Sequence, residues 1–291
     1  MKKTIAKLLS LALAGTAVAG LSVTAYAEED HVITVAASPT PHAEILEKAA
    51  ELLEEEGWTL EITEFTDYVQ PNLVVDEGEI LANYFQHTPY LESFNEEQGT
   101  DLVSVAKIHY EPMGIYVGTK SSIDDLEDGD TIAVPNDTTN EARALLLLEA
   151  NGVLTLPEDA DLTVTANDVV SFKDDLDIEI IEVEAAQVAQ YVDEVAFCVV
   201  NGNYALSAGL SSSDALAFES SDSEAAQTYA NVVVVKAGNE ENEGVQALVE
   251  VLQSDEIKDF ITETYDGSVV PYEESAEEAE TEAAETEAVT E

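Results

Sequence analysis

Short apolar runs alternate with helical segments along most of this chain, and this alternation constrains the fold more than any other feature. Strand-like runs lie at 31–37, 58–65, 80–84, 102–108, 113–118, 131–134, 178–183, 195–200 and 231–236, and helical patterns at 43–56, 67–76, 88–97, 138–150, 185–191 and 241–264. Such alternation is typical of largely parallel sheets that are covered by helices. We therefore expect an α/β fold of two units, in which the last strand and the helices after it can belong to either unit.

The N-terminus has the pattern of a secretory signal. A lysine-rich start precedes an apolar stretch at 8–19, and residues 25–27 read Ala-Tyr-Ala, which fits a cleavage site. Cleavage there would make Glu28 the first mature residue and place the protein outside the cytoplasm, as a secreted, cell-envelope or periplasmic protein. The alternative is an uncleaved membrane anchor. No cysteine lies at the end of the predicted signal, so we expect no thioether-linked lipid.

The one cysteine and the C-terminal segment suggest no chemistry. Cys198 lies in the apolar run 195–200, has no partner for a disulfide, and is expected to be a buried apolar side chain. Residues 273–291 contain nine glutamates and no apolar stripe, which is typical of a disordered acidic tail.

Charge and motifs exclude several classes of function. The 291 residues include 62 acidic and 10 basic ones, for a formal net charge of −52, so we expect neither nucleic acid nor an anionic membrane surface as a partner. The four histidines lack the spacing of metal ligands, and no nucleophile motif or phosphate-binding loop is present. We therefore predict no enzyme activity, no metal and no cofactor. A hydrolase would need a nucleophile–base pair that the sequence does not reveal. A secreted acidic scaffold that binds calcium remains an alternative.

Arg143 is the only arginine in the chain, and it lies about one turn into the helix predicted at 138–150. Its planar guanidinium suits bidentate capture of a carboxylate or a phosphate, and a helix N-terminus favours an anion. The alternative is that Arg143 pairs with one of the many acidic side chains.

Aromatic and amide side chains gather where predicted strands end. Tyr68 follows the second strand, while Phe85, His87 and Tyr90 follow the third. Ligands of open α/β sheets bind at the carboxyl ends of the strands, so these four side chains could line an apolar slot; alternatively they are core aromatics and a helix-capping histidine. Asn201 and Asn231 also lie at strand boundaries. Their amides could fix the head group of an amino acid, or they could serve as turn and cap residues.

Several segments resemble the methionine-binding proteins of bacterial ABC importers, the NlpA or MetQ lipoprotein family. These segments are PHAEIL at 41–46, FTDYVQPN at 65–72, ANYFQHTPYL at 82–91, IAVPND at 132–137, TN at 139–140, RALLLL at 143–148, VN at 200–201, YA at 204–205 and YANV at 229–232. The similarity covers residues 31–270. The chain departs from the family in lacking the lipobox cysteine, in its acidic tail and negative charge, and in Asn203, where other members often carry small or hydroxyl residues.

The resemblance implies a two-lobed periplasmic-binding-protein architecture of type II, with a hinge of two crossovers near 111–116 and 222–230. The implied divisions are a signal peptide at 1–27, lobe 1 at 28–112, lobe 2 at 113–224, a return to lobe 1 at 225–272, and the tail at 273–291. It implies a monomer that performs no chemistry, captures methionine or a close analogue between its lobes, and passes it to the membrane subunits of an ABC importer. Another amino acid or a methionine-containing dipeptide is the alternative ligand within this fold.

The resemblance also implies roles for individual residues. Arg143 would hold the ligand carboxylate, and Asn201 and Asn231 would bond the amino-acid head group. The walls of the side-chain pocket would be Tyr68, Phe85, His87 and Tyr90. Asn140 would either support the turn that carries the arginine or contact the ligand.

Overall fold

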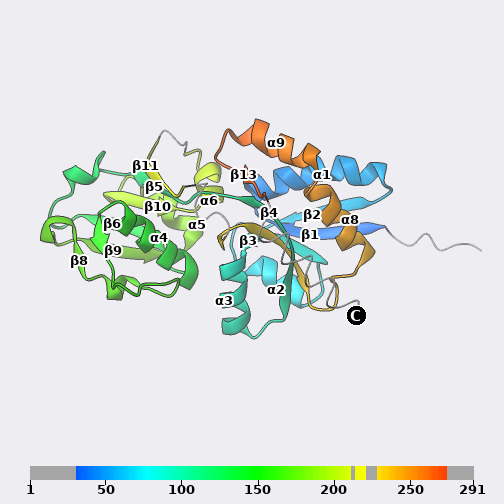
Figure 1. The fold of residues 1–291 in the computed structure, drawn as a ribbon, viewed down its shortest axis with the longest axis horizontal. Helices are drawn as coiled ribbons and strands as arrows, with labels where there is room; N and C mark the ends of the chain where they lie inside the picture. The colour runs from blue at the N-terminus through cyan, green and yellow to red at the C-terminus, as the bar shows by residue number, and fades with distance from the viewer. Residues whose placement is uncertain (1–30, 211–213, 221–227, 274–291) are drawn as a thin grey trace, which may run out of the picture. The chain divides into compact units, whose positions relative to one another are not determined.

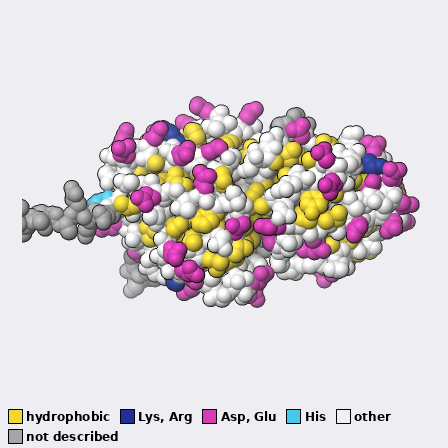
Figure 2. Space-filling model, turned by 180° about the vertical axis from the view of Figure 1, so that it is seen from behind, with side chains coloured by type: hydrophobic (Ala, Val, Ile, Leu, Met, Phe, Trp, Pro, Cys, Tyr) yellow, Lys and Arg dark blue, Asp and Glu magenta, His cyan; other side chains and the backbone are white. Residues whose placement is uncertain are grey.

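The computed structural model describes residues 31–210, 214–220 and 228–273 (Figure 1). The predicted signal segment, and the predicted tail beyond residue 273, lie outside the described residues. Within the described parts of the chain, no helix is long and apolar enough to cross a membrane. Asp and Glu side chains are spread over the face shown in Figure 2, with few Lys or Arg side chains among them.

The first sheet contains the early strands and the last ones. Its six strands, in spatial order, are β13 (Val270–Pro271), β4 (Leu102–Tyr110), β12 (Asn231–Lys236), β3 (Ala82–His87), β1 (Val32–Ala37) and β2 (Thr59–Glu64). Its helices are α1 (Glu44–Glu55), α2 (Gln70–Asp76), α3 (Thr88–Gln98), α8 (Glu243–Leu252) and α9 (Asp255–Tyr265). The last strands and helices therefore join the first unit.

The central strand β12 shows why helices cover both faces of this sheet. Its four consecutive valines are all fully buried, and successive side chains of a strand point to opposite faces. Val233 and Val235 pack in the cluster that contains α1, α8 and α9, whereas Val232 and Val234 pack with residues of α2 and α3. The two groups of helices lie on opposite sides of the sheet in Figure 1.

The second sheet contains the middle of the chain. Its five strands, in spatial order, are β11 (Ala215–Phe218), β5 (Gly114–Val117), β10 (Phe197–Val200), β6 (Thr131–Pro135) and β9 (Glu179–Val183). Its helices are α4 (Thr138–Ala150), α5 (Ala185–Val188) and α6 (Gly202–Ser207), and β7 (Leu154–Thr155) pairs with β8 (Ser171–Phe172) outside the sheet. Cys198 is fully buried under α5 and α6, as predicted, and burial raises the pKa of its thiol to about 12.

Several local predictions are wrong in detail. Both sheets are mixed rather than largely parallel, because β12 and β5 each follow a strand of the other sheet and pair antiparallel with their neighbours. The third strand runs three residues beyond the predicted Tyr84, and the predicted helix at 185–191 continues after α5 only as a tight turn. The helical stretch 241–264 is two helices. The N-cap residue of α1 is Ala43, whose side chain makes no capping hydrogen bond.

Two connections join the sheets. The chain leaves β4 at Tyr110 and enters β5 at Gly114, and it leaves β11 at Phe218 and returns at the start of β12. Residues 221–227 of the second connection lie outside the described residues. The domain limits predicted from the sequence stay a prediction.

Candidate functional site

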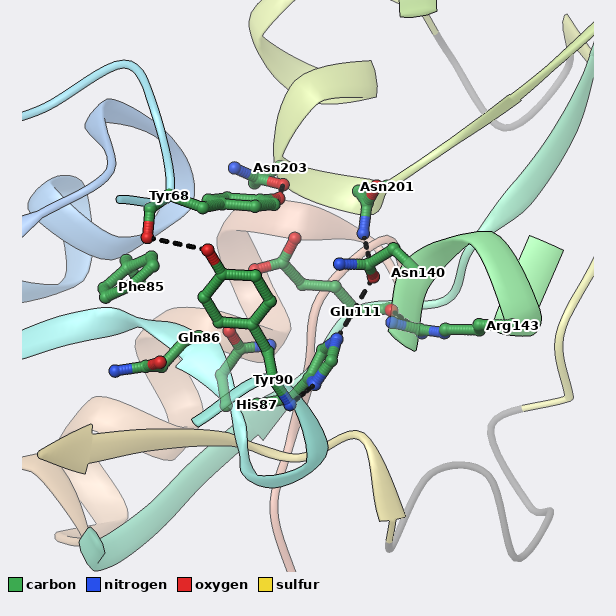
Figure 3. A pocket seen from close by; sticks show the side chains of 12 residues that line it. Tyr68, Phe85, Gln86, His87, Tyr90, Glu111, Asn140, Arg143, Asn201 and Asn203 are labelled. Atoms are coloured by element: carbon green, nitrogen blue, oxygen red, sulfur yellow. Dashed lines mark hydrogen bonds between the residues drawn. The ribbon is translucent and has the colours of Figure 1, made fainter. Parts of the chain in front are cut away.

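A pocket lies where the carboxyl ends of β3 and β10 meet the N-terminus of α4 (Figure 3). It encloses about 330 Å³, part of it open to solvent. Its lining residues are Tyr68, Phe85, Gln86, His87, Tyr90, Glu111, Asn140, Arg143, Asn201, Gly202, Asn203 and Asn231. All eight residues that the sequence singled out are among them, contributed by both sheets. The role of each residue in binding stays a prediction.

Three aromatic rings form one side of the pocket. The ring of Tyr68 lies 5.8 Å from that of Phe85 and 5.7 Å from that of Tyr90, measured between centroids. Two hydrogen bonds hold the hydroxyl groups: Tyr68 donates to Asn203 Oδ1 at 2.6 Å, and Tyr90 donates to the Tyr68 carbonyl at 3.0 Å. Burial raises the pKa of the Tyr68 hydroxyl, which therefore stays neutral. The result is an apolar slot with fixed walls.

His87 both caps a helix and borders the pocket, the two possibilities that the sequence left open. Its Nδ1 accepts the backbone N–H of Tyr90 at 3.2 Å and so caps α3, while its other edge borders the pocket. Burial, followed by the charge of Arg143, lowers the pKa of His87 to about 3, so the ring is neutral at physiological pH. A neutral ring that accepts at Nδ1 carries its proton on Nε2.

Asn140 sets the orientation of the amide groups around it. Its Nδ2 lies 2.7 Å from Asp137 Oδ1, an oxygen that also accepts the backbone N–H of Asn140 at 3.1 Å, so Nδ2 donates there. Asn140 Oδ1 then accepts from His87 Nε2 at 3.1 Å and from Asn201 Nδ2 at 2.7 Å. Asn201 Oδ1 is consequently left as a buried acceptor, with no hydrogen-bond partner among the described residues. Asn140 thus supports the turn before Arg143 and also borders the pocket.

Arg143 pairs with an acidic side chain, which is the alternative that its sequence position left open. Its Nε donates to Glu219 Oε1 at 2.8 Å and its Nη2 to Glu219 Oε2 at 2.5 Å, while Nη2 also donates to the Glu111 carbonyl at 3.0 Å. Its guanidinium lies over the ring of Tyr229, 4.1 Å from the centroid. None of these contacts uses Nη1. One edge of the guanidinium is therefore held by the protein, and Arg143 still borders the pocket.

Glu219 is ionised despite its position. Burial would raise the pKa of its carboxyl, but the charge of Arg143 and hydrogen bonds from that guanidinium, from Met113 N–H and from Tyr110 outweigh burial, so the pKa lies below its usual value. The sequence did not identify Glu219, because 62 acidic residues offer no local signal that would single it out.

Glu111 is a second carboxylate that sequence reasoning missed. It follows β4, is 5% exposed, and lies among the labelled side chains of Figure 3. Its Oε1 accepts from His109 Nε2 at 2.8 Å and lies 3.4 Å from His42 Nε2, while Tyr84 donates to His109 Nδ1. The separation of two between His109 and Glu111 was a usable signal, since such residues share one face of a strand. Nothing in the sequence placed His42 beside them.

The ligating atoms of His42, His109 and Glu111 lie within 4.8 Å of one another, a spacing that could hold a metal ion. The observed contacts are those of a hydrogen-bonded network: burial lowers the pKa of His42 to about 4 and that of His109 to about 3, so both rings are neutral donors. His42 Nε2 also meets Asn231 Oδ1 at 3.0 Å. Because the amide oxygen of Asn231 faces His42, its NH₂ group is available to the pocket. The prediction of no metal ligand stays a prediction.

Comparison with known proteins finds relatives along nearly the whole described chain. The model of the NlpA lipoprotein family matches residues 33–273. The methionine-binding lipoprotein MetQ of Bacillus subtilis (strain 168) is 38% identical over 274 residues, which cover 93% of this chain and 99% of that protein.

Two solved structures share the fold. A lipoprotein from Ruminococcus gnavus ATCC 29149 is 61% identical, with a TM-score of 0.81 over 84% of this chain and 100% of that one. A nutrient-binding protein from Burkholderia cenocepacia, whose structure was solved bound to methionine, is 38% identical, with a TM-score of 0.77 over 83% of this chain and 100% of that one.

Proposed function

The chain belongs to the NlpA lipoprotein family, and on that premise we propose that it is an extracytoplasmic solute-binding protein that captures methionine and delivers it to an ABC importer. The predicted two-lobed α/β architecture is confirmed by its structural neighbours. In the proposal, lobe 1 is the first sheet with its helices, and lobe 2 is the second sheet with its helices. The protein acts as a monomer and performs no chemistry.

The observation that carries the proposal is the division of the pocket into an apolar slot and a polar end. The slot between Tyr68, Phe85 and Tyr90 suits a thioether, because sulfur packs favourably against aromatic rings. At the polar end, Nη1 of Arg143 and the NH₂ group of Asn231 are donors for a carboxylate. An α-amino acid with an unbranched apolar side chain matches both ends.

The bonds between the lobes suggest how binding is communicated. Tyr68 of lobe 1 donates to Asn203 of lobe 2, and His87 of lobe 1 donates to Asn140 of lobe 2. A ligand that touches both sides adds to these bonds and shifts the protein toward the closed arrangement. The importer's membrane subunits would then recognise the closed form.

A thermal-shift panel of the mature chain tests the proposal, after unfolding and refolding to remove bound ligand. The panel contains the twenty amino acids and methionine-containing dipeptides. Methionine at about 100 times its Kd should stabilise the folded chain by roughly 2.7 kcal/mol. A shift with a different ligand would retain the mechanism and change the substrate. No shift with any compound, from a folded chain, would refute the proposal and favour the acidic, calcium-binding scaffold.

The variant Arg143→Ala provides the second arm of this experiment. We expect it to lose methionine binding, because the ligand carboxylate would be buried without its cation. Wild-type affinity in a folded variant would refute the role given to Arg143. The matched control is Lys173→Ala, which removes a cation that pairs with Asp124; neither residue lines the pocket.

A further inference from the structure

A second cavity lies beside the two connections that join the sheets, and we call it the hinge cavity. It encloses about 670 Å³, part of it open to solvent, which is a volume typical of small-molecule sites. Its walls come from β5, β11 and α6 of lobe 2 and from the turn that follows α9 of lobe 1. One residue of each connection, Pro112 of the first and Glu219 of the second, completes the lining.

Much of the wall of the hinge cavity is apolar. The rings of Tyr116 and Phe218 stand edge to face, with their centroids 5.8 Å apart, and Leu206 and Leu210 line the same space. Leu206, Leu210 and Phe218 are only partly buried in the protein, so each leaves apolar surface exposed at the cavity. A ligand with an apolar body would remove that surface from water, which favours binding.

The charged residues of the hinge cavity are acidic. Glu219 and Asp266 line it, and none of its described lining residues is basic. Glu219 is ionised and paired with Arg143, whereas Asp266 is exposed and its carboxylate makes no hydrogen bond or ion pair with the described residues. A third carboxylate lies near the wall: burial raises the pKa of the Tyr116 hydroxyl to about 12, and the charge of Asp214 adds to this effect. The cavity therefore favours a cation over an anion.

The hinge cavity is joined to the pocket through shared residues. Gly202 lines both spaces. Glu219 lines the hinge cavity and accepts from Nε of Arg143 at 2.8 Å, and Arg143 lines the pocket. Both spaces are bounded by residues of both lobes, so both depend on one arrangement of the lobes. A ligand that binds either space in this arrangement favours it, and thereby favours binding in the other.

We propose that the hinge cavity is a second ligand site, which takes a small organic cation with an apolar body and whose occupation raises the affinity of the pocket for its own ligand. The apolar body would cover Leu206, Leu210 and Phe218, and the cationic group would meet Asp266. The aromatic ring of Phe218 can attract the same cation through its face. The binding of a cation is independent of the proposed function, whereas the coupling between the two sites rests on it.

The test of binding compares three probes of similar shape that differ in charge. NMR titration of the isotope-labelled chain measures the affinities for phenethylammonium, for the neutral phenylethanol and for the anion phenylpropanoate. Excess methionine, or the amino acid that the thermal-shift panel identifies, keeps the probes out of the pocket. We expect the cation to bind at least about fivefold more tightly than the alcohol, and the anion to bind most weakly.

The variant Asp266→Asn locates the cation. Asp266 caps α9 with a φ of 47°, in the left-handed region that asparagine also adopts, so the variant should fold. Its affinity for phenethylammonium should fall at least about threefold, while that for phenylethanol should stay within about 1.5-fold of wild type. The matched control is Asp259→Asn, which removes an exposed carboxylate of α9 outside the lining and should leave the affinities for all three probes unchanged.

The test of coupling titrates methionine with and without phenethylammonium. The bound probe should raise the affinity for methionine at least about threefold, and methionine should raise the affinity for the probe by the same factor, since coupling between two sites is reciprocal. Asp266→Asn should bind methionine like wild type when no probe is present, because Asp266 does not line the pocket.

The outcomes separate this inference from the proposed function. Equal affinities for the cation and the alcohol, or an affinity for the cation that Asp266→Asn leaves unchanged, would overturn the cation site while methionine binding stands. A cation that binds without changing the affinity for methionine would overturn the coupling. A wild type that binds no α-amino acid would overturn the proposed function and the coupling with it, and the three probes, titrated without amino acid, would still decide whether the hinge cavity takes a cation.

Discussion

Replacing Glu219 by glutamine tests how strongly the arginine is held. The Glu219 carboxylate accepts from Arg143 Nε at 2.8 Å and Nη2 at 2.5 Å, from the Tyr110 hydroxyl at 2.8 Å and from Met113 N–H at 2.9 Å. Glutamine offers one oxygen and turns an NH₂ group toward the remaining donors. At least one donor, Arg143 Nε, would lose its acceptor, and the guanidinium would lose its counter-charge.

The cost follows from burial, because the side chain of Glu219 is 9% exposed. Each unsatisfied buried donor costs about 1–3 kcal/mol, and breaking a buried ion pair by removing one charge costs about 3–5 kcal/mol. These figures describe the same loss and are not added. We expect Glu219→Gln to lower the free energy of unfolding by about 3–5 kcal/mol, which corresponds to a Tm decrease of roughly 6–20 °C.

Urea denaturation and calorimetry without ligand measure this loss. A loss below about 1 kcal/mol would refute the reasoning, because the pair would then behave like an exposed one. Asp124→Asn is the control: it removes the 2.8 Å contact with Lys173 at an exposed carboxylate and should leave the unfolding midpoint unchanged.

The stability lost in Glu219→Gln should also depend on pH. Because the folded-state pKa of Glu219 lies below the usual 4.5, its stabilisation is present above that pH and is lost as the pH falls through the lower value. The difference between wild type and Glu219→Gln should shrink accordingly in acid.

Three further predictions concern the bond between lobes, a pair of acidic side chains and the thiol. Tyr68→Phe removes the donor to Asn203 and should speed ligand release about fivefold in stopped-flow measurements, as expected for about 1 kcal/mol; an unchanged rate would contradict it. Burial, with Glu182 nearby, raises the pKa of Glu141 to about 7, so the ionised form destabilises the fold above that pH and stability rises as the pH falls toward 4.5. Glu141→Gln should therefore raise the Tm at pH 8 by about 2–4 °C, and an equal rise at pH 4.5 would argue against this cause. Cys198 should resist an aromatic disulfide reagent in the native chain and react once it is unfolded, and rapid reaction of the native chain would show that the site opens easily.

Two controls sharpen these measurements. Tyr68→Phe in an Asn203→Ala background should add little to the release rate, because the acceptor is already gone. For Glu141, whose Oε1 accepts the Ala166 backbone N–H at 2.7 Å, glutamine is the suitable replacement because its carbonyl oxygen can keep that bond.

The sequence predicted the elements of the fold well where local pattern decides them. The helix at 138–150 was predicted at its observed bounds, because Asp137 is a capping residue and the apolar positions recur with helical spacing. Strand direction was predicted less well. Whether β12 runs parallel or antiparallel to β3 depends on where the chain comes from, and the second connection between sheets decides that. A local pattern carries no such information.

The residues of the site show the same difference between local sequence pattern and long-range contact. The four aromatic and histidine residues of the slot were found because they follow strands, and strand ends converge in an α/β sheet. Glu219 and His42 were not found, because each is defined by a partner distant in sequence: Glu219 lies 76 residues from Arg143, and His42 lies 189 residues from Asn231. Their partners become apparent only when the two connections between sheets bring them together.

Arg143 contacts both of the connections that join the two sheets, and this limits how the protein could be re-engineered. Its Nη2 meets the carbonyl of Glu111 in the first connection, while Glu219 and Tyr229 belong to the second. One side chain therefore borders the pocket and contacts both of the chain segments that join the two sheets. A designer who wants a biosensor for another α-amino acid should vary the aromatic walls and leave this arginine unchanged. Replacing it to accept a ligand without a carboxylate would change the angle between the lobes in the ligand-free protein as well as the ligand that is bound. Ligand specificity and the conformational signal could therefore not be adjusted separately.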